Sequence, residues 1–160
     1  NSFKRARASS SVRALVQTHH DAGVPTSVAG YSMAGQLGSH AVATLPFEVP
    51  VVAMAAPTSA DVVFIEGPLA GQLRWEALGD GAKEKLREVF QHADLLKLEP
   101  PKSTKRAVAL NAGDGIVAPG STGKLAKHWG VEPLTLRTGH TGAYVFERRA
   151  LQRLISDTLR

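Results

Sequence analysis

Three residues of this chain have side chains and settings that suit nucleophilic catalysis: Ser32, Asp114 and His140. A serine hydroxyl attacks an acyl carbonyl when a histidine accepts its proton and a carboxylate orients that histidine. Each of the three follows a short apolar run that predicts a β-strand, and each lies beside glycine or another small residue. They are candidates for one site that attacks acyl carbonyls, provided that the fold brings them together.

Ser32 lies within Thr26–Gly35, TSVAGYSMAG, which predicts a strand, a sharp turn and the first turn of a helix. A serine in such a turn, a nucleophile elbow, needs small residues two positions before and after it, because strand and helix nearly touch. Gly30 and Ala34 occupy these positions. Ala34 adds one methyl group to the usual glycine, and Gly35 follows it, so the sequence remains compatible with the turn.

The turn would also aim the backbone N–H of Met33 at the serine, where it could stabilise an oxyanion. Each residue has an ordinary structural interpretation as well. Ser32 could cap a helix, Asp114 precedes a glycine as in a common turn, and His140 could lie at the start of the last helix. The combination of all three favours the catalytic interpretation.

The elements that must position these residues alternate along the chain. Strands are predicted over residues 26–30, 51–55, 107–110 and 133–136, and helices over residues 9–23, 33–44, 119–129 and 143–159. The last helix should turn five apolar side chains inward: Val145, Leu151, Leu154, Ile155 and Leu159. This alternation predicts an α/β fold, with a mostly parallel sheet and flanking helices, in which loops after the strands meet at one edge.

A long segment, about residues 58–99, separates the second and third predicted strands. It predicts helices, among them an amphipathic one over Ala82–Leu98, and insertions of this size commonly cover a site as a cap. We expect Phe64, Trp75 and Tyr31, which precedes the serine, to contact substrate. Aromatic residues at helical spacing are also typical of an ordinary core.

The composition is that of an ordinary globular domain, with 43% hydrophobic and 21% charged residues among 160. The chain contains no cysteine, which fits a reducing, cytoplasmic compartment and excludes thiolate chemistry. Its net charge of +5 favours anionic partners. Residues 1–8 form a basic arm ahead of the domain over residues 9–160. The sequence contains no ligand spacing typical of a metal site and no cofactor-binding or nucleic-acid-binding motif, so we expect no metal, cofactor or nucleic acid. The basic residues could instead contact an anionic membrane.

The motifs GYSMAG, GDGIVAP and TGHTG, with their order serine, aspartate, histidine, resemble the C-terminal half of an α/β-hydrolase. Residues 57–75, PTSADVVFIEGPLAGQLRW, look like the segment after the serine in a poorly characterised branch of hydrolase-domain proteins. The resemblance implies that Ser32 is the nucleophile, His140 the base and Asp114 the orienting acid of a serine hydrolase. Carboxylic esters, with lipid acyl esters foremost, are the implied substrates.

The resemblance also implies further strands ahead of the first predicted one, whose edge would otherwise be open for pairing. A missing N-terminal half or a second copy of the chain is then the expected partner, and a reduced domain with one oxyanion donor is the remaining explanation. The alternative is a catalytically silent α/β module that keeps the elbow as architecture and binds a protein partner or its missing half through that edge.

Overall fold

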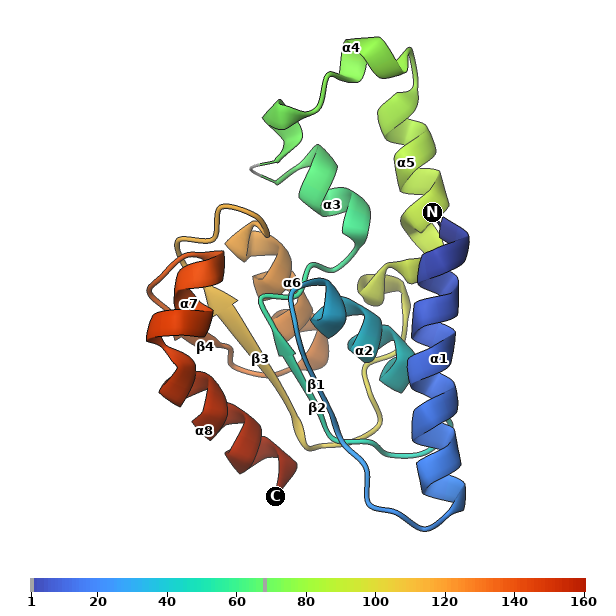
Figure 1. The fold of residues 1–160 in the computed structure, drawn as a ribbon, viewed down its shortest axis with the longest axis vertical. Coiled ribbons are helices and arrows are strands. Elements are labelled where there is room, and N and C mark those ends of the chain that lie inside the picture. The colour runs from blue at the N-terminus through green and yellow to red at the C-terminus, as the bar shows by residue number, and fades with distance from the viewer. Residues whose placement is uncertain (1, 68) are drawn as a thin grey trace.

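The structure is a computed structural model that describes residues 2–67 and 69–160. Asn1 of the expected basic arm and Pro68 of the expected insertion lie outside the described residues. Within the described part, four strands form one parallel sheet in the order β1 (Val28–Tyr31), β2 (Val51–Met54), β3 (Arg106–Asn111) and β4 (Leu134–Leu136). The sheet lies between helices, so the predicted α/β class is confirmed (Figure 1).

The alternation of side chains along the strands builds two cores. On β2, Val51 and Ala53 pack with α1 (Ser2–Asp21), α2 (Met33–Ala43) and α6 (Pro119–Trp129) on one face. Val52 and Met54 pack on the other face with α7 (His140–Phe146) and α8 (Arg148–Leu159). All four residues of β2 are buried, as the continuous apolar run predicts for a parallel strand covered on both faces.

Three helices differ from the predicted ones. The first begins at Ser2 and continues through most of the expected arm, because residues 2–9 include good helix formers and no glycine or proline. The last predicted helix is divided at Glu147, and Val145, expected inside, is 60% exposed. The amphipathic helix in the insertion ends at Phe90 instead of Leu98 and continues as two short 3₁₀ turns, Gln91–Ala93 and Leu95–Lys97.

The segment between β2 and β3 extends beyond the carboxyl ends of the strands (Figure 1). It contains α3 (Ala60–Ile65), a 3₁₀ turn at Ala70–Gln72, α4 (Trp75–Leu78) and α5 (Ala82–Phe90). Its base is tied to the core by hydrogen bonds. The Thr58 N–H donates to the Ser121 hydroxyl of α6 at 3.0 Å, and the buried Gln36 amide of α2 donates to the Ala93 carbonyl at 2.8 Å. The insertion is therefore anchored at its base.

The core on the α6 side provides a test of this architecture. Leu125 is fully buried, so Leu125→Ala should lower the free energy of unfolding by about 2–5 kcal/mol through lost burial and a residual cavity. Leu78→Ala is the matched control, because Leu78 is 62% exposed and its loss should change stability by less than about 0.5 kcal/mol. Urea unfolding of both variants measures the difference, and equal effects would contradict the packing described.

Candidate active site

The three candidate residues lie on loops at one edge of the sheet. Ser32 directly follows β1, Asp114 lies three residues after the end of β3, and His140 is the first residue of α7, after β4. The strands are parallel, so these loops all leave the sheet at its carboxyl edge.

Ser32 forms a strained turn between β1 and α2. Its φ of 56° and ψ of −128° lie in a region that side chains other than glycine rarely adopt. The Ser32 N–H donates to the Met54 carbonyl at 2.7 Å, which ties the turn to β2. Met33 begins α2, so its N–H has no acceptor within the helix. The residue is thus held between a strand end and a helix start.

The small residues around Ser32 are required by close backbone contact. A Cβ on Gly30 would lie 2.6 Å from the carbonyl atoms of Ala34, and a Cβ on Gly35 would lie 2.7 Å from the Gly30 oxygen. Both distances are shorter than any real Cβ contact, so only glycine fits these two positions. The side chain of Ala34 is exposed, which explains why its methyl group is accommodated where a glycine is usual.

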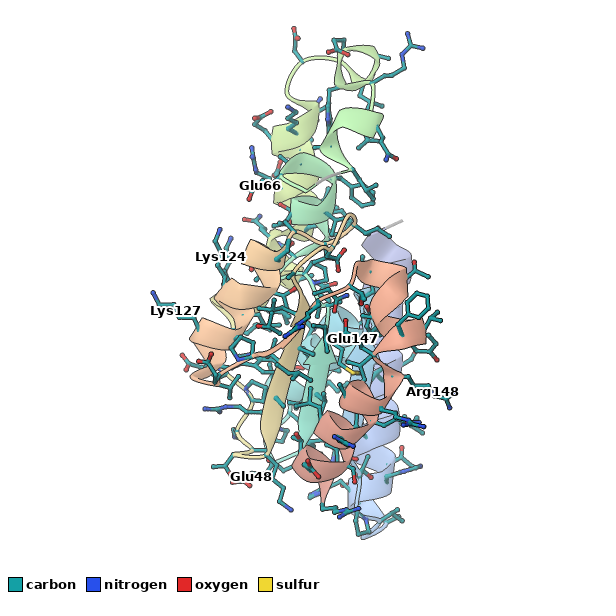
Figure 2. The ribbon with its side chains drawn as sticks, turned by 90° about the vertical axis from the view of Figure 1, so that its left-hand side faces the viewer. Glu48, Glu66, Lys124, Lys127, Glu147 and Arg148 are labelled. Carbon is teal, nitrogen blue, oxygen red and sulfur yellow. The ribbon has the colours of Figure 1, made fainter. Side chains whose placement is uncertain are left out.

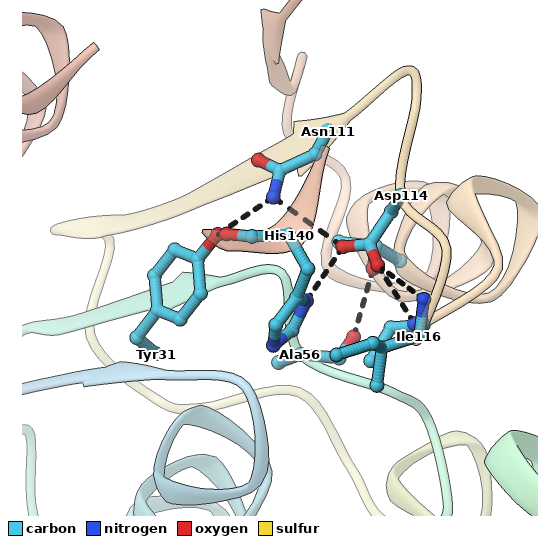
Figure 3. Close-up of polar contacts among 8 residues, drawn as sticks. Tyr31, Ala56, Asn111, Asp114, Ile116 and His140 are labelled. Carbon is cyan, nitrogen blue, oxygen red and sulfur yellow. Dashed lines mark hydrogen bonds and ion pairs between the residues drawn. The ribbon is translucent and has the colours of Figure 1, made fainter. Parts of the chain in front are cut away.

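Asp114 and His140 form a direct pair (Figure 3). The His140 Nδ1 lies 2.8 Å from Asp114 Oδ2, and their side chains are 13% and 2% exposed. Asp114 Oδ1 accepts the backbone N–H groups of Ile116 and Val117, each at 2.8 Å. With Nδ1–H donated to the carboxylate, the other ring nitrogen, Nε2, carries the lone pair that can accept a proton. This arrangement suits a histidine base oriented by a carboxylate.

Tyr31 is bound into the same network. The Asn111 amide donates to the Tyr31 hydroxyl at 2.6 Å and to Asp114 Oδ2 at 3.3 Å, and the Tyr31 hydroxyl donates to the His140 carbonyl at 2.5 Å (Figure 3). Burial is the main reason why the pKa of Tyr31 is raised, which keeps the hydroxyl a donor. The Tyr31 hydroxyl therefore connects β1 with the histidine and aspartate loops, while contact of Tyr31 with a substrate stays a prediction.

Asn111 is the residue that the sequence interpretation missed. It is the last residue of β3 and 1% exposed, and its amide contacts both Tyr31 and Asp114. The available signal was a polar side chain at the end of an apolar strand, three residues before the candidate acid.

Glu147 holds the turn that leads to His140. Its Oε1 accepts the N–H groups of Arg137 and Thr138, each at 2.9 Å, and the Thr138 hydroxyl at 2.7 Å. The hydrogen bond from the Thr138 hydroxyl is the largest cause of the lowered pKa of Glu147. The two backbone N–H donors lower this pKa further. Next to this turn, a Cβ on Gly139 would lie 3.0 Å from the Gly113 carbonyl oxygen, so the histidine and aspartate loops touch.

The two aromatic residues of the insertion take different places. Phe64 is half-buried on α3. Trp75 lies on α4, at the end of the insertion away from the sheet, where its indole donates to the Ala70 carbonyl at 3.0 Å and Lys83 lies over its ring (Figure 1). The structure does not bring Trp75 to the other candidates, because the insertion extends away from them.

No group of three or more histidine, cysteine, aspartate or glutamate side chains among the described residues could hold a metal ion. Each helix of the described residues is too short or too polar to span a lipid bilayer.

The Tyr31 network generates a stability prediction. Tyr31→Phe leaves the Asn111 amide and the His140 carbonyl with one partner fewer, so the free energy of unfolding should fall by about 1–3 kcal/mol. Tyr144→Phe makes the same chemical change at a residue that is 65% exposed and should have an effect below about 0.5 kcal/mol. A double-mutant cycle of Tyr31→Phe with Asn111→Ala should show non-additivity, and additive effects would contradict the contact.

Glu147 generates a pH prediction. Its pKa in the folded chain lies below the ordinary 4.5, so its charge stabilises the fold fully above pH 4.5, and this stabilisation is lost as the pH falls through the lowered pKa. The wild type should therefore exceed Glu147→Gln in unfolding free energy at neutral pH and converge with it in acid. Exposed Glu132→Gln is the control. A difference that persists in strong acid would refute the charged contact.

The comparisons with known proteins agree with the fold. Among solved structures, the Pyrococcus furiosus esterase Pf2001 has a TM-score of 0.62 at 12% identity, covering 93% of this chain and 59% of that one. The acetyl xylan esterase from Paenibacillus sp. R4 has a TM-score of 0.66 at 18% identity, covering 91% and 50%. The chain thus spans between half and three fifths of the length of these two proteins. A search of curated proteins found no match.

The family assignment comes from a sequence model. The model described as "Alpha/beta hydrolase domain containing 18" matches residues 8–93, which is more than half of the 160 residues. The matched region contains the elbow and most of the insertion, and the α/β sheet and the hydrolase-like structural neighbours are consistent with it. The chain therefore belongs to the alpha/beta hydrolase domain containing 18 family.

Proposed function

We propose that this chain carries the serine, histidine and aspartate of a carboxylic ester hydrolase. The observation that carries the proposal is the 2.8 Å contact between His140 Nδ1 and the buried Asp114 carboxylate, on the same sheet edge as Ser32. The strained backbone of Ser32 and its place between β1 and α2 support its role as nucleophile. The family's hydrolase fold supports the general reaction class.

In the proposed reaction, the Ser32 hydroxyl attacks the ester carbonyl while His140 Nε2 accepts the hydroxyl proton. Asp114 stabilises the resulting imidazolium through Nδ1–H. The negative oxygen of the tetrahedral intermediate accepts from the Met33 N–H. The C–O bond to the alcohol then breaks, and His140 gives its proton to the leaving oxygen. Water, deprotonated by His140, releases the acid from the acyl-enzyme and restores Ser32.

The proposed substrate class is esters with an apolar, lipid-type acyl group. Support comes from the insertion beyond the carboxyl edge of the sheet, which carries half-buried Phe64 on α3. Insertions of this kind can exclude water from a site and receive apolar groups. Trp75 is left out of this proposal because its contacts lie within the insertion.

The rate of ester hydrolysis depends on a second oxyanion donor. In α/β-hydrolases a second oxyanion N–H comes from a loop ahead of the nucleophile strand. This chain spans 59% and 50% of the two esterases compared above. Lacking one oxyanion donor lowers the rate by about 10²–10³. Residues 1–160 are therefore tested with an irreversible probe, which detects a reactive serine even where turnover is slow.

Labelling with a fluorophosphonate probe tests the proposal. The wild-type chain should be labelled, Ser32→Ala should not, and Asp114→Asn should be labelled several orders of magnitude more slowly because the histidine loses its orienting charge. Ser27→Ala, an exposed serine five residues earlier, is the matched control and should be labelled like the wild type. Absence of labelling in a folded wild-type chain would instead favour a silent module that binds a partner through the edge of β1.

A further inference from the structure

The end of α7 exposes three consecutive large side chains. Tyr144, Val145 and Phe146 are 65%, 60% and 80% exposed. Single exposed apolar residues are common on protein surfaces, whereas three large ones in succession at a helix end favour contact with another apolar phase. Ala143, directly before them, is fully buried in the core with α8, so α7 is held in this orientation.

Three exposed arginines follow in the chain, on the adjoining helix. Arg148, Arg149 and Arg153 of α8 are all exposed, and Figure 2 shows Arg148 directed away from the body of the molecule. The other face of α8 is apolar and includes Leu151, which packs against the sheet. The exposed surface made by residues 144–146 and the three arginines is called the α7–α8 surface below.

The charge of the α7–α8 surface is not neutralised within the described chain. Among the described side chains, the one ion pair between an arginine and a carboxylate joins Arg87 with Glu84, and none involves the three arginines of this surface. The adjacent Glu147 carboxylate is occupied by the turn at Arg137 and Thr138. Asp157 is the one acidic residue in the depression that Arg149 and Arg153 line on α8. The surface therefore joins exposed apolar groups to a net positive charge.

We propose that the α7–α8 surface docks on an anionic lipid bilayer. A bilayer interface presents apolar acyl chains next to anionic phosphates, which matches exposed Val145 and Phe146 followed within a few residues of the chain by three exposed arginines. Each basic residue near an anionic leaflet adds attraction, and apolar insertion adds a second, salt-independent contribution. Nucleic acid would use the arginines and leave the apolar residues in water.

Docking at this surface would place the candidate site next to the lipid. His140 and Phe146 are the first and last residues of α7, about 9 Å apart along the helix. The Tyr144 ring lies 6.0 Å from that of Tyr31, which precedes Ser32. The docking itself does not rest on the proposed hydrolysis, so Ser32→Ala should bind vesicles like the wild type while failing to react with the probe.

Cosedimentation with vesicles tests the proposal. The chain should bind vesicles of phosphatidylcholine mixed with phosphatidylglycerol and bind phosphatidylcholine alone much more weakly. Replacing Arg148, Arg149 and Arg153 by glutamine should weaken binding to anionic vesicles by about fivefold per residue, on the order of a hundredfold together. Phe146→Ser should weaken it by about tenfold and should leave its salt dependence unchanged, because the apolar contribution to the binding free energy does not depend on salt.

Control variants distinguish binding through the α7–α8 surface from the effect of removing any exposed positive charge or any exposed apolar side chain. Lys124 and Lys127 are exposed on α6, and their replacement by glutamine should reduce binding far less than the arginine changes. Leu78→Ser changes an apolar residue that is 62% exposed on α4 and should have no effect. All replaced residues are exposed, so thermal unfolding should remain at the wild-type temperature and confirm that the variants fold.

Three results would overturn the proposal. Equal binding to neutral and anionic vesicles would remove the role of the arginines, and equal losses from the control variants would remove the role of this surface. A dimer that Phe146→Ser converts into monomers, with vesicle binding unchanged, would assign the surface to contact between copies of the chain. Sedimentation velocity of the wild type and of Phe146→Ser measures this last outcome.

Discussion

The buried carboxylate of Asp114 is the group on which the arrangement at the sheet edge depends. A buried charge is tolerated only when hydrogen bonds satisfy its oxygens. One oxygen accepts two backbone N–H groups of its own loop, and the other contacts the Asn111 amide and the His140 ring. Asn111 extends the network to Tyr31, the residue before Ser32. Satisfying one charge thus connects loops from three strands.

The strained turn at Ser32 persists because its surroundings leave it little alternative. The Ser32 N–H is bonded to β2, and the backbones of Gly30 and of Ala34–Gly35 are in contact, so relaxing the turn would break both arrangements. The sheet that supports the turn is covered on both faces by apolar side chains that alternate along β2. The apolar core therefore holds the strained backbone of Ser32 in place, although the core residues do not take part in the proposed reaction.

Helix α7 joins three roles in seven residues. His140 at its start contacts Asp114, Ala143 in its middle packs into the core, and Phe146 at its end lies in solvent. The carboxylate of Glu147, which follows, holds the turn before His140. The proposed base and the start of the proposed lipid-facing surface are consequently parts of one short helix.

The sequence by itself determined the α/β class, the apolar strands, the glycine-rich turn at Ser32 and the chain order of the three candidate residues, because these follow from local pattern and spacing. Only the tertiary structure decided that Tyr31 bonds to Asn111 and His140, that Trp75 lies away from the site, and that Val145 faces solvent. Tyr31 and Asn111 are 80 residues apart, so no local pattern predicts their contact. Helical periodicity did not predict the break at Glu147, because the Glu147 carboxylate accepts a hydrogen bond from Arg137, ten residues earlier. Periodicity reports which side chains are apolar, whereas the partners of a polar group depend on where the whole chain places them.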